Sequence, residues 1–287
     1  MTRVTMQKNP ASTRRAATLR GQLLFFALAC AVISGGFWMA LPLVGGAVTT
    51  SPGIWLYSLG ACGPSLAALL AVLLLSRGDV PRRRIRRPWV WVPAALVLGA
   101  LPAVVSAVIV SGGRLGAHAG ETITSMGGLL PFIAIFLLTG PIAEEFGWRG
   151  YVQPRLRMRL GVLPTAAVLG ATWAVWHLPL FLLAGTGQHA MGLFTPRAGV
   201  YLLTMVPLSV LFLFVSEWLS GGVWAAIVLH FAGNATGALL PQANLAGGLA
   251  QLGVVVALAC GCLWAWRRIP PRSATRSTDS HFVPVGG

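Results

Sequence analysis

The sequence predicts an all-α membrane protein with about eight transmembrane helices. Its 287 residues are 56% hydrophobic and 9% charged, with a mean hydropathy of +0.76, whereas soluble domains carry roughly 25% charged residues. A helix needs roughly 20 apolar residues to cross a bilayer. Eight apolar runs approach that length, at about 22–44, 54–76, 89–111, 127–143, 161–184, 198–219, 221–240 and 247–266.

The basic residues predict the orientation of these spans. Of the 21 lysines and arginines, 19 fall in four clusters, with five in residues 1–20, six in 77–87, four in 149–159 and four in 267–276. Cytoplasmic loops of membrane proteins carry an excess of positive charge. Eight spans that begin in the cytoplasm place all four clusters there and leave Arg114 and Arg197 outside. We therefore expect a multi-pass protein of the cell membrane with both termini cytoplasmic.

The same distribution explains the net charge of +15. Basic clusters beside membrane spans bind anionic lipid headgroups, so the lipid bilayer is an expected partner and nucleic acid is not. We expect a basic cytoplasmic tail at 1–20, a single transmembrane domain at 21–268 and a second cytoplasmic tail at 269–287. The four cysteines all lie within the apolar runs, a placement that indicates neither a disulfide framework nor a zinc cluster.

Two adjacent acidic residues give the strongest functional signal. The chain has only six acids, and Glu144 and Glu145 follow directly after the apolar run 127–143. A charged side chain at bilayer depth costs several kcal/mol by most estimates, and such residues usually serve function. Because the run is short, we expect the aromatic residues beyond it to extend it as an interfacial or re-entrant helix. The acids would then lie at the end of an apolar helix, near the inner face of the membrane.

The spacing around this pair gives the two carboxylates different roles. Arg149 follows Glu145 by four residues, so the two side chains share a helix face in the favoured order for an ion pair. Glu144 is rotated about 100° away and is free to face a cavity as a general base. The alternative is a structural ion pair with Glu144 at headgroup level.

Two histidines in later spans supply further polar groups. Trp173 precedes His177 by one turn, so its ring can wall the imidazole and orient it. Asn234 follows His230 by four residues on one helix face, where the two side chains offer hydrogen bonds to a developing oxyanion. The alternatives are a core histidine bonded to a carbonyl at His177, and an interhelical polar clamp at His230 and Asn234.

Three spans thus each contribute one polar turn, and we expect a shared cavity that holds Glu144, Glu145, His177, His230 and Asn234. A carboxylate and an imidazole can deprotonate water, and the second histidine with the asparagine can stabilise a tetrahedral intermediate. No serine, cysteine or aspartate stands at a suitable spacing to act as the nucleophile instead. The pattern indicates hydrolysis.

The ordered set Glu-Glu-x-x-x-Arg, aromatic-x-x-x-His and His-x-x-x-Asn, on separate spans, resembles the type II CAAX prenyl endopeptidases, also called the CPBP or Abi family of intramembrane proteases. The resemblance covers about residues 125–240. Trp173 stands where phenylalanine is commoner in the family. The resemblance implies cleavage of a peptide bond in a polar cavity open toward the cytoplasmic leaflet, and the predicted place of Glu144 near the inner face agrees with it.

The resemblance also implies roles for the residues. Glu144 and His177 would activate water, His230 and Asn234 would hold the oxyanion, and Glu145, Arg149 and Trp173 would support the site. The family is described both as zinc metalloproteases and as glutamate proteases without a metal. Glu144, His177 and His230 would be the zinc ligands in the first case, although no His-Glu-x-x-His motif is present.

We therefore expect an intramembrane endopeptidase that hydrolyses membrane-tethered peptides or proteins, whether or not they are prenylated. The main alternative is a non-catalytic membrane scaffold or bacteriocin-immunity protein of the same family. A proton-coupled transporter also uses acids within the membrane, but the sequence has no internal repeat of the kind typical of many transporters.

Overall fold

The computed structural model describes residues 18–44, 47–75, 84–111, 119–240 and 244–268, and every regular element within these ranges is a helix. The predicted all-α class is confirmed. The predicted tail at 269–287 and nearly all of the tail at 1–20 lie outside the described residues.

The long helices correspond to the predicted spans. The α-helices are α1 (Leu19–Ala40), α2 (Gly53–Ala61), α3 (Gly63–Leu74), α4 (Pro88–Ser111), α5 (Ala119–Ser125), α6 (Leu129–Leu137), α7 (Ala143–Gly147), α8 (Gln153–Arg157), α9 (Val162–His177), α10 (Gly187–Met191), α11 (Pro196–Leu213), α12 (Gly222–Leu239) and α13 (Leu245–Arg268). Among the described residues, seven helical runs are long and apolar enough to cross a bilayer. The pair α2 and α3, bent by 51°, makes an eighth if it is one span.

The fourth span differs from the prediction. Helix α6 continues through a π-helical turn (Leu138–Ile142), α7, a second π-helical turn (Trp148–Val152) and α8, giving one apolar run over Leu129–Arg157. Glu144 and Glu145 therefore lie near the middle of this run, and the expectation that they end a helix was wrong. The run continues because the polar groups beyond the acids find partners inside the protein, as Arg155 does with Gln22 of α1.

Two prolines shape the helices that carry the predicted site. Pro141 lies inside the first π-helical turn, where the widened backbone accommodates a residue that has no N–H and would clash in a regular helix. Ser65 of α3 donates a hydrogen bond of 3.0 Å to the carbonyl of Ile142 in this turn. Pro179 lies in the 3₁₀ turn Leu178–Leu182, which closes α9 directly after His177.

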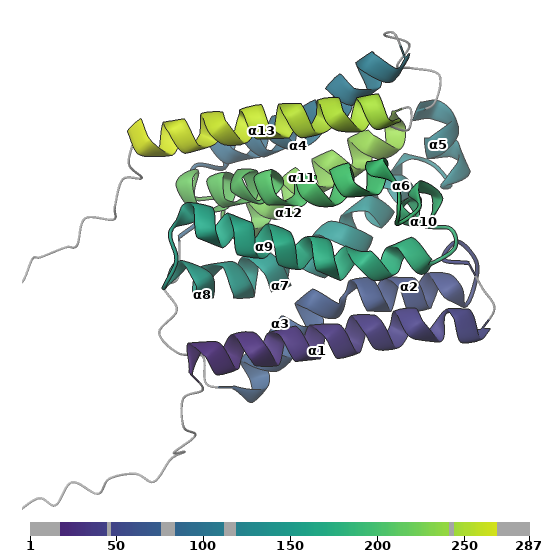
Figure 1. The fold of residues 1–287 in the computed structure, drawn as a ribbon, viewed down its shortest axis with the longest axis horizontal. Coiled ribbons are helices and arrows are strands. Elements are labelled where there is room, and N and C mark those ends of the chain that lie inside the picture. Colours follow the sequence, from purple (N-terminus) through teal and green to yellow (C-terminus); the bar gives the residue numbers. More distant parts are fainter. Residues whose placement is uncertain (1–17, 45–46, 76–83, 112–118, 241–243, 269–287) are drawn as a thin grey trace, which may run out of the picture.

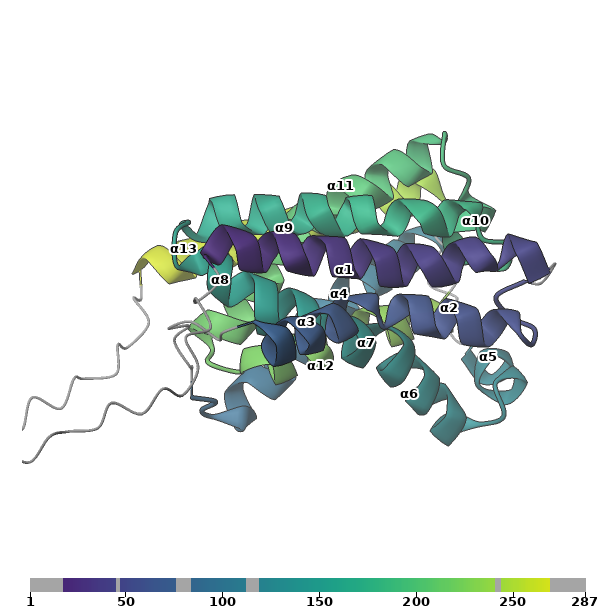
Figure 2. The same ribbon diagram turned by 90° about the horizontal axis from the view of Figure 1, so that it is seen from below.

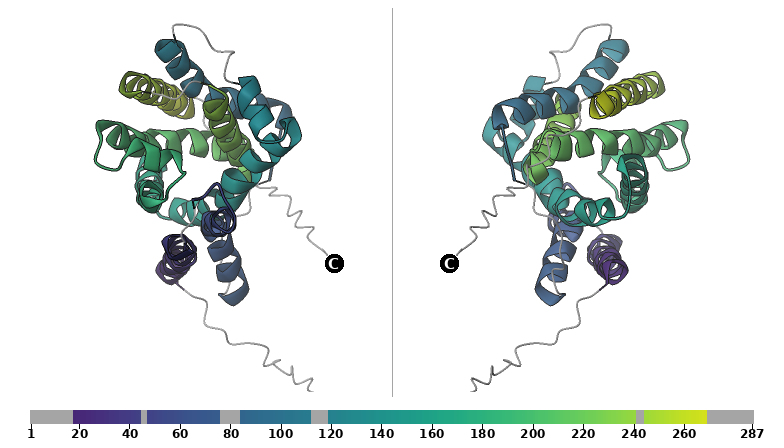
Figure 3. Two further views of the ribbon diagram at one scale, coloured as in Figure 1. Left: turned by 90° about the vertical axis from the view of Figure 1, so that its right-hand side faces the viewer. Right: turned by 90° about the vertical axis from the view of Figure 1, so that its left-hand side faces the viewer.

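The helices form one bundle (Figure 1). Helices α1, α2 and α3 lie on one side, α4 and α13 lie on the opposite side, and α7, α9, α11 and α12 lie between them (Figure 3). Helix α6 is inclined away from the other helices, and α5 lies beyond it (Figure 2). The acidic turn of α7 therefore lies inside the bundle.

Close packing holds α7 against its neighbours. Gly147 of α7 lies so near Pro64 of α3 that a Cβ atom on the glycine would overlap the Pro64 backbone. On the other side, Phe26 of α1 contacts Trp148 and Tyr151, with ring centroids 5.5 Å apart in each case. Small residues that allow close backbone approach are typical of helix contacts in membranes. These contacts fix the rotation of α7 and hence the directions of its two carboxylates.

Candidate active site

Glu145 forms the centre of a buried ionic cluster. Its Oε1 atom lies 3.1 Å from Nη1 of Arg149 and 2.7 Å from Nδ1 of His230 on α12. The Glu145 side chain has no exposed surface, and the Arg149 side chain is 1% exposed. The predicted pairing of Glu145 with Arg149 is therefore present, and the sequence did not anticipate that His230 joins the same oxygen.

Two aromatic rings complete the surroundings of Arg149. Its guanidinium carbon lies 3.7 Å from the ring centroid of Phe212 and 4.6 Å from that of Trp173. Nε and Nη2 of Arg149 have no hydrogen-bond partner among the described residues. Contact of a cation with aromatic faces is worth about 2 kcal/mol when it is desolvated, so the rings offset part of the cost of burying this charge.

Trp173 connects the acidic turn to His177. Its indole N–H donates a hydrogen bond of 2.7 Å to Oε2 of Glu144. Its backbone carbonyl lies 2.8 Å from Nδ1 of His177. Because a carbonyl oxygen only accepts, Nδ1 of His177 carries the proton, and Nε2 is left as an acceptor. Trp173 thus does more than form the aromatic wall that the sequence predicted, since it also holds a carboxylate that phenylalanine would leave free.

The remaining polar atoms converge at Gly140, which lies in the first π-helical turn. A Cβ atom placed on Gly140 would lie 3.1 Å from Nδ2 of Asn234, 3.5 Å from Nε2 of His230 and 3.8 Å from Oε1 of Glu144. These are the atoms left over once Oε2 of Glu144 and Nδ1 of His230 have bonded elsewhere. The missing side chain at Gly140 leaves a small space surrounded by a carboxylate, an imidazole and an amide.

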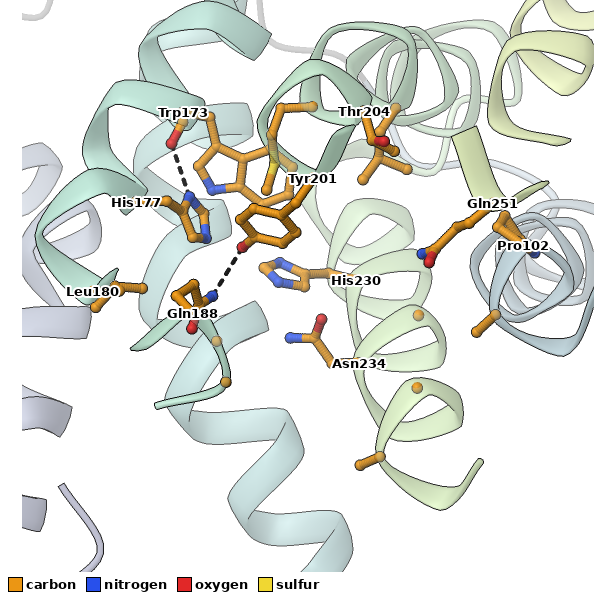
Figure 4. A pocket seen from close by; sticks show the side chains of 18 of the residues that line it. Pro102, Trp173, His177, Leu180, Gln188, Tyr201, Thr204, His230, Asn234 and Gln251 are labelled. Carbon is orange, nitrogen blue, oxygen red and sulfur yellow. Dashed lines mark hydrogen bonds between the residues drawn. The ribbon is translucent and has the colours of Figure 1, made fainter. Parts of the chain in front are cut away.

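This space belongs to a cavity of about 520 Å³. His177, His230 and Asn234 point into it from α9 and α12 (Figure 4). Glu144 and Trp173 also line the cavity, whereas Glu145 and Arg149 lie behind its wall. The structure therefore brings all seven predicted site residues together and separates them into five that face the cavity and two that support them.

Sequence reasoning missed several polar residues of the cavity, among them Tyr201 and Gln188. Tyr201 of α11 lies against the ring of His177, with centroids 5.9 Å apart, and its hydroxyl accepts a hydrogen bond of 2.9 Å from Gln188 of α10 (Figure 4). Tyr201 has Arg197 four residues before it and Thr204 three residues after it, so polar residues at helical spacing were a signal that could have found it. Gln188 stands in a loop region of the sequence, where a polar residue is ordinary.

The three predicted zinc ligands each keep one donor atom free of the hydrogen bonds described above: Oε1 of Glu144, Nε2 of His177 and Nε2 of His230. Their chemistry suits zinc, which takes about three protein ligands in catalytic sites. In the part of the chain that the structure describes, however, no three His, Cys, Asp or Glu side chains form a group that could hold a metal ion. The described residues as they lie do not fit a zinc site.

Glu217 lies away from the cavity. Its carboxylate accepts hydrogen bonds of 3.1 Å from Gln153 and from Arg157, and it does not line the cavity. His189 also lies outside the lining, with Nδ1 3.1 Å from the carbonyl of Phe181. Neither residue is therefore part of the candidate site. His118 and His281 lie outside the described residues.

The cavity occupies one half of the bundle. It extends from Glu144 to Gln188 of α10 and Asn244 before α13. The arginines at the start of α1 and the ends of α8 and α13 lie at the opposite end (Figure 1). The sequence predicted that these clusters are cytoplasmic and that the cavity opens toward the cytoplasmic leaflet. The structure does not allow both, because the cavity extends away from the arginine-rich end.

Comparison with known proteins identifies the motif region. Residues 126–236 match the family of type II CAAX prenyl endopeptidases described as Rce1-like. The segment is therefore similar to that family. CAAX prenyl protease 2 of Methanococcus maripaludis is 26% identical over 109 residues, which cover 38% of this chain and 40% of the relative. The matched segment contains all seven predicted site residues, and it spans less than half of the length of the relative.

The ionic cluster predicts a large loss of stability in Arg149→Met. The variant leaves the buried Glu145 with His230 as its only partner in the cluster, and removing one member of a buried pair costs about 3–5 kcal/mol. Thermal unfolding of the purified protein in lipid nanodiscs would measure the loss. Arg159→Met, at an exposed position just beyond α8, is the matched control and should unfold like the wild type. Equal stability of the two variants would contradict the role assigned to the cluster.

Proposed function

We propose that this protein is an intramembrane endopeptidase that hydrolyses peptide bonds of membrane-tethered substrates with a water activated by Glu144 and His177. The observation that carries the proposal is the convergence of Glu144, His230 and Asn234 around Gly140. A base and two potential hydrogen-bond donors around a single small space are what hydrolysis of a carbonyl compound requires. The family match supports the class of reaction.

In the proposed reaction, Glu144 transfers the proton and His177 orients the water. Oε1 of Glu144 takes a proton from water while the water oxygen attacks the carbonyl carbon of the peptide bond. Nε2 of His177, fixed as an acceptor by the bond at Nδ1, orients the same water. When the tetrahedral intermediate collapses, the carbon–nitrogen bond breaks and Glu144 returns the proton to the leaving nitrogen. The products are a carboxylic acid and an amine, and the carboxylate is ready for another turnover.

In this scheme, His230 and Asn234 stabilise the oxyanion of the tetrahedral intermediate by hydrogen bonds. Nδ2 of Asn234 is a donor at any pH. Nε2 of His230 donates only when the imidazole carries both protons, and the scheme requires that form, in which Nδ1 donates to Glu145 over 2.7 Å. Two carboxylates then balance Arg149 and the imidazolium, so the buried site is neutral overall. A neutral set of charges is less costly to bury than an excess of one sign.

The scaffold alternative has a specific weakness. A structural clamp would use each polar atom in a bond to another part of the protein, as Glu145 does with Oε1. Glu144 instead keeps Oε1 at an open space in the cavity wall, and the amide of Asn234 is exposed. Polar atoms held at a cavity without partners of their own favour an enzyme.

The cell membrane remains the proposed location of the protein, with both termini in the cytoplasm.

Glu144→Gln tests the proposal against the scaffold directly. The variant keeps the shape and the acceptor for the Trp173 N–H but cannot take a proton, and loss of a general base lowers rates by about 10²–10⁴-fold. Mass spectrometry of membrane-proteome N-termini should show new termini in cells that express the wild type and almost none with the variant at equal protein levels. Identical sets of N-termini, together with a preserved biological phenotype, would favour a non-catalytic scaffold.

Gly140→Ala tests the space at the centre of the site. The added Cβ atom would lie 3.1 Å from Nδ2 of Asn234 and would displace this side chain by a few tenths of an ångström. Because catalysis is sensitive to small misplacements, we expect cleavage of an identified substrate to fall about ten-fold, with thermal stability unchanged. Gly237→Ala, in open space on the same cavity wall, should cleave at the wild-type rate. An unaffected Gly140→Ala enzyme would argue against this position for the reaction.

A chelator distinguishes the two mechanisms described for the family. Glu144 alone supplies the base in the proposed scheme, so purified protein treated with 1,10-phenanthroline and dialysed should cleave as before. Elemental analysis of the same sample should find no stoichiometric zinc. Loss of activity that returns when Zn²⁺ is added back would replace this scheme with a metal-dependent one.

A further inference from the structure

The two ends of the bundle differ strongly in charge. At one end, Arg155 bonds to Gln22 near the start of α1, Arg157 pairs with Glu217, and the backbone N–H of Arg86 bonds to Ser220. Arg267 and Arg268 close α13 at the same end (Figure 1). These contacts bring together parts of the basic clusters that the sequence assigned to one membrane face, and this end is called the basic end below.

The opposite end carries little charge. The loop before α2 meets the loop before α10 there, through a backbone bond of 3.0 Å from Val48 to Ala184. Arg197, at the start of α11, is the one lysine or arginine at this end among the described residues. Since positive charge is retained on the cytoplasmic side, the basic end faces the cytoplasm and this weakly charged end faces outward.

The cavity lies in the outward half. Its wall includes Gln188 and Arg197 near the outer end and Gln251 in the first half of α13. No residue of α8, and neither Arg267 nor Arg268, is part of the lining. Glu144, near the middle of its span, is the one acidic residue among the described residues of the cavity lining. The cavity therefore extends from Glu144 toward the outer end of the bundle.

We infer that the protein cleaves extracytoplasmic segments of membrane-anchored proteins, at bonds close to the outer face of the membrane. This assignment of the substrate class rests on the proposed endopeptidase function. The cavity of about 520 Å³ is within the range of roughly 300–1,000 Å³ typical of small-ligand pockets. It accepts a short unfolded peptide segment and excludes a folded domain, so the substrate offers a flexible stretch next to its membrane anchor.

Thiol labelling tests the side of access without any need for activity. Phe194→Cys reports the outer end, where this side chain is 98% exposed, and Met158→Cys reports the basic end. Both are made in a parent whose four native cysteines are replaced by alanine. A membrane-impermeant maleimide should label Phe194→Cys in intact cells and Met158→Cys only after permeabilisation. The reverse pattern would overturn the inference. If the cysteine-free parent does not accumulate, the variants are made in the wild type, whose own labelling gives the background.

A third variant tests the cavity itself. Gln251→Cys lines the cavity, so a small charged methanethiosulfonate should label it in intact cells, as it does Phe194→Cys. Protection of Gln251→Cys in intact cells, with labelling only after permeabilisation, would show access from the cytoplasm and overturn the inference.

The positions of the cleaved bonds test the substrate class. Glu144-dependent N-termini should map to extracytoplasmic residues close to transmembrane anchors. Termini on cytoplasmic segments would overturn the inference while supporting the proposed endopeptidase. An absence of Glu144-dependent termini would overturn the proposed function and the substrate class with it, and thiol labelling would still decide which side the cavity faces.

Discussion

The structure of the site depends on one buried oxygen, Oε1 of Glu145. This atom accepts from Arg149 on its own helical run and from His230 on α12, so it joins two helices that are far apart in the sequence. Burying a carboxylate without partners would cost several kcal/mol, so the bundle is most stable when both partners are in place. The same bonds orient His230, because the imidazole can turn only its Nε2 atom toward the cavity. Glu145, which does not line the cavity, thus determines which atom of His230 faces it.

Glu144 can face the cavity without a cationic partner because Glu145 already pairs with Arg149 and His230. The two carboxylates are adjacent in sequence and about 100° apart on a helix, so one points into the protein and the other toward the cavity. Trp173 holds one oxygen of Glu144 and leaves the second beside Gly140. The π-helical turn at Leu138–Ile142 contributes as well, since it brings a residue without a side chain to this point. Functional sites are frequent locations of such turns.

The family resemblance and the charge distribution lead to different expectations about access. The family motifs suggested a cavity facing the cytoplasmic leaflet, and the matched segment covers less than half of the chain. Among the described residues, the arginines at the start of α1, in α8 and at the end of α13 lie at the opposite end of the bundle from the cavity. The orientation of a span in the membrane is set by its charged flanks, so the motifs within the spans do not determine which side the cavity faces.

The sequence by itself determined the helical class, the approximate positions of most spans, the ion pair of Glu145 with Arg149 and the seven residues that the structure brings together. These features depend on local rules, namely hydropathy, helical period and four-residue spacing, and on a resemblance carried by short motifs. Only the tertiary structure decided that His230 bonds to Glu145, that Trp173 bonds to Glu144, that Tyr201 lines the cavity and that the cavity extends away from the arginines. Those features depend on how helices rotate and pack against one another. The spacing of side chains along one helix does not specify which face of a second helix they will contact.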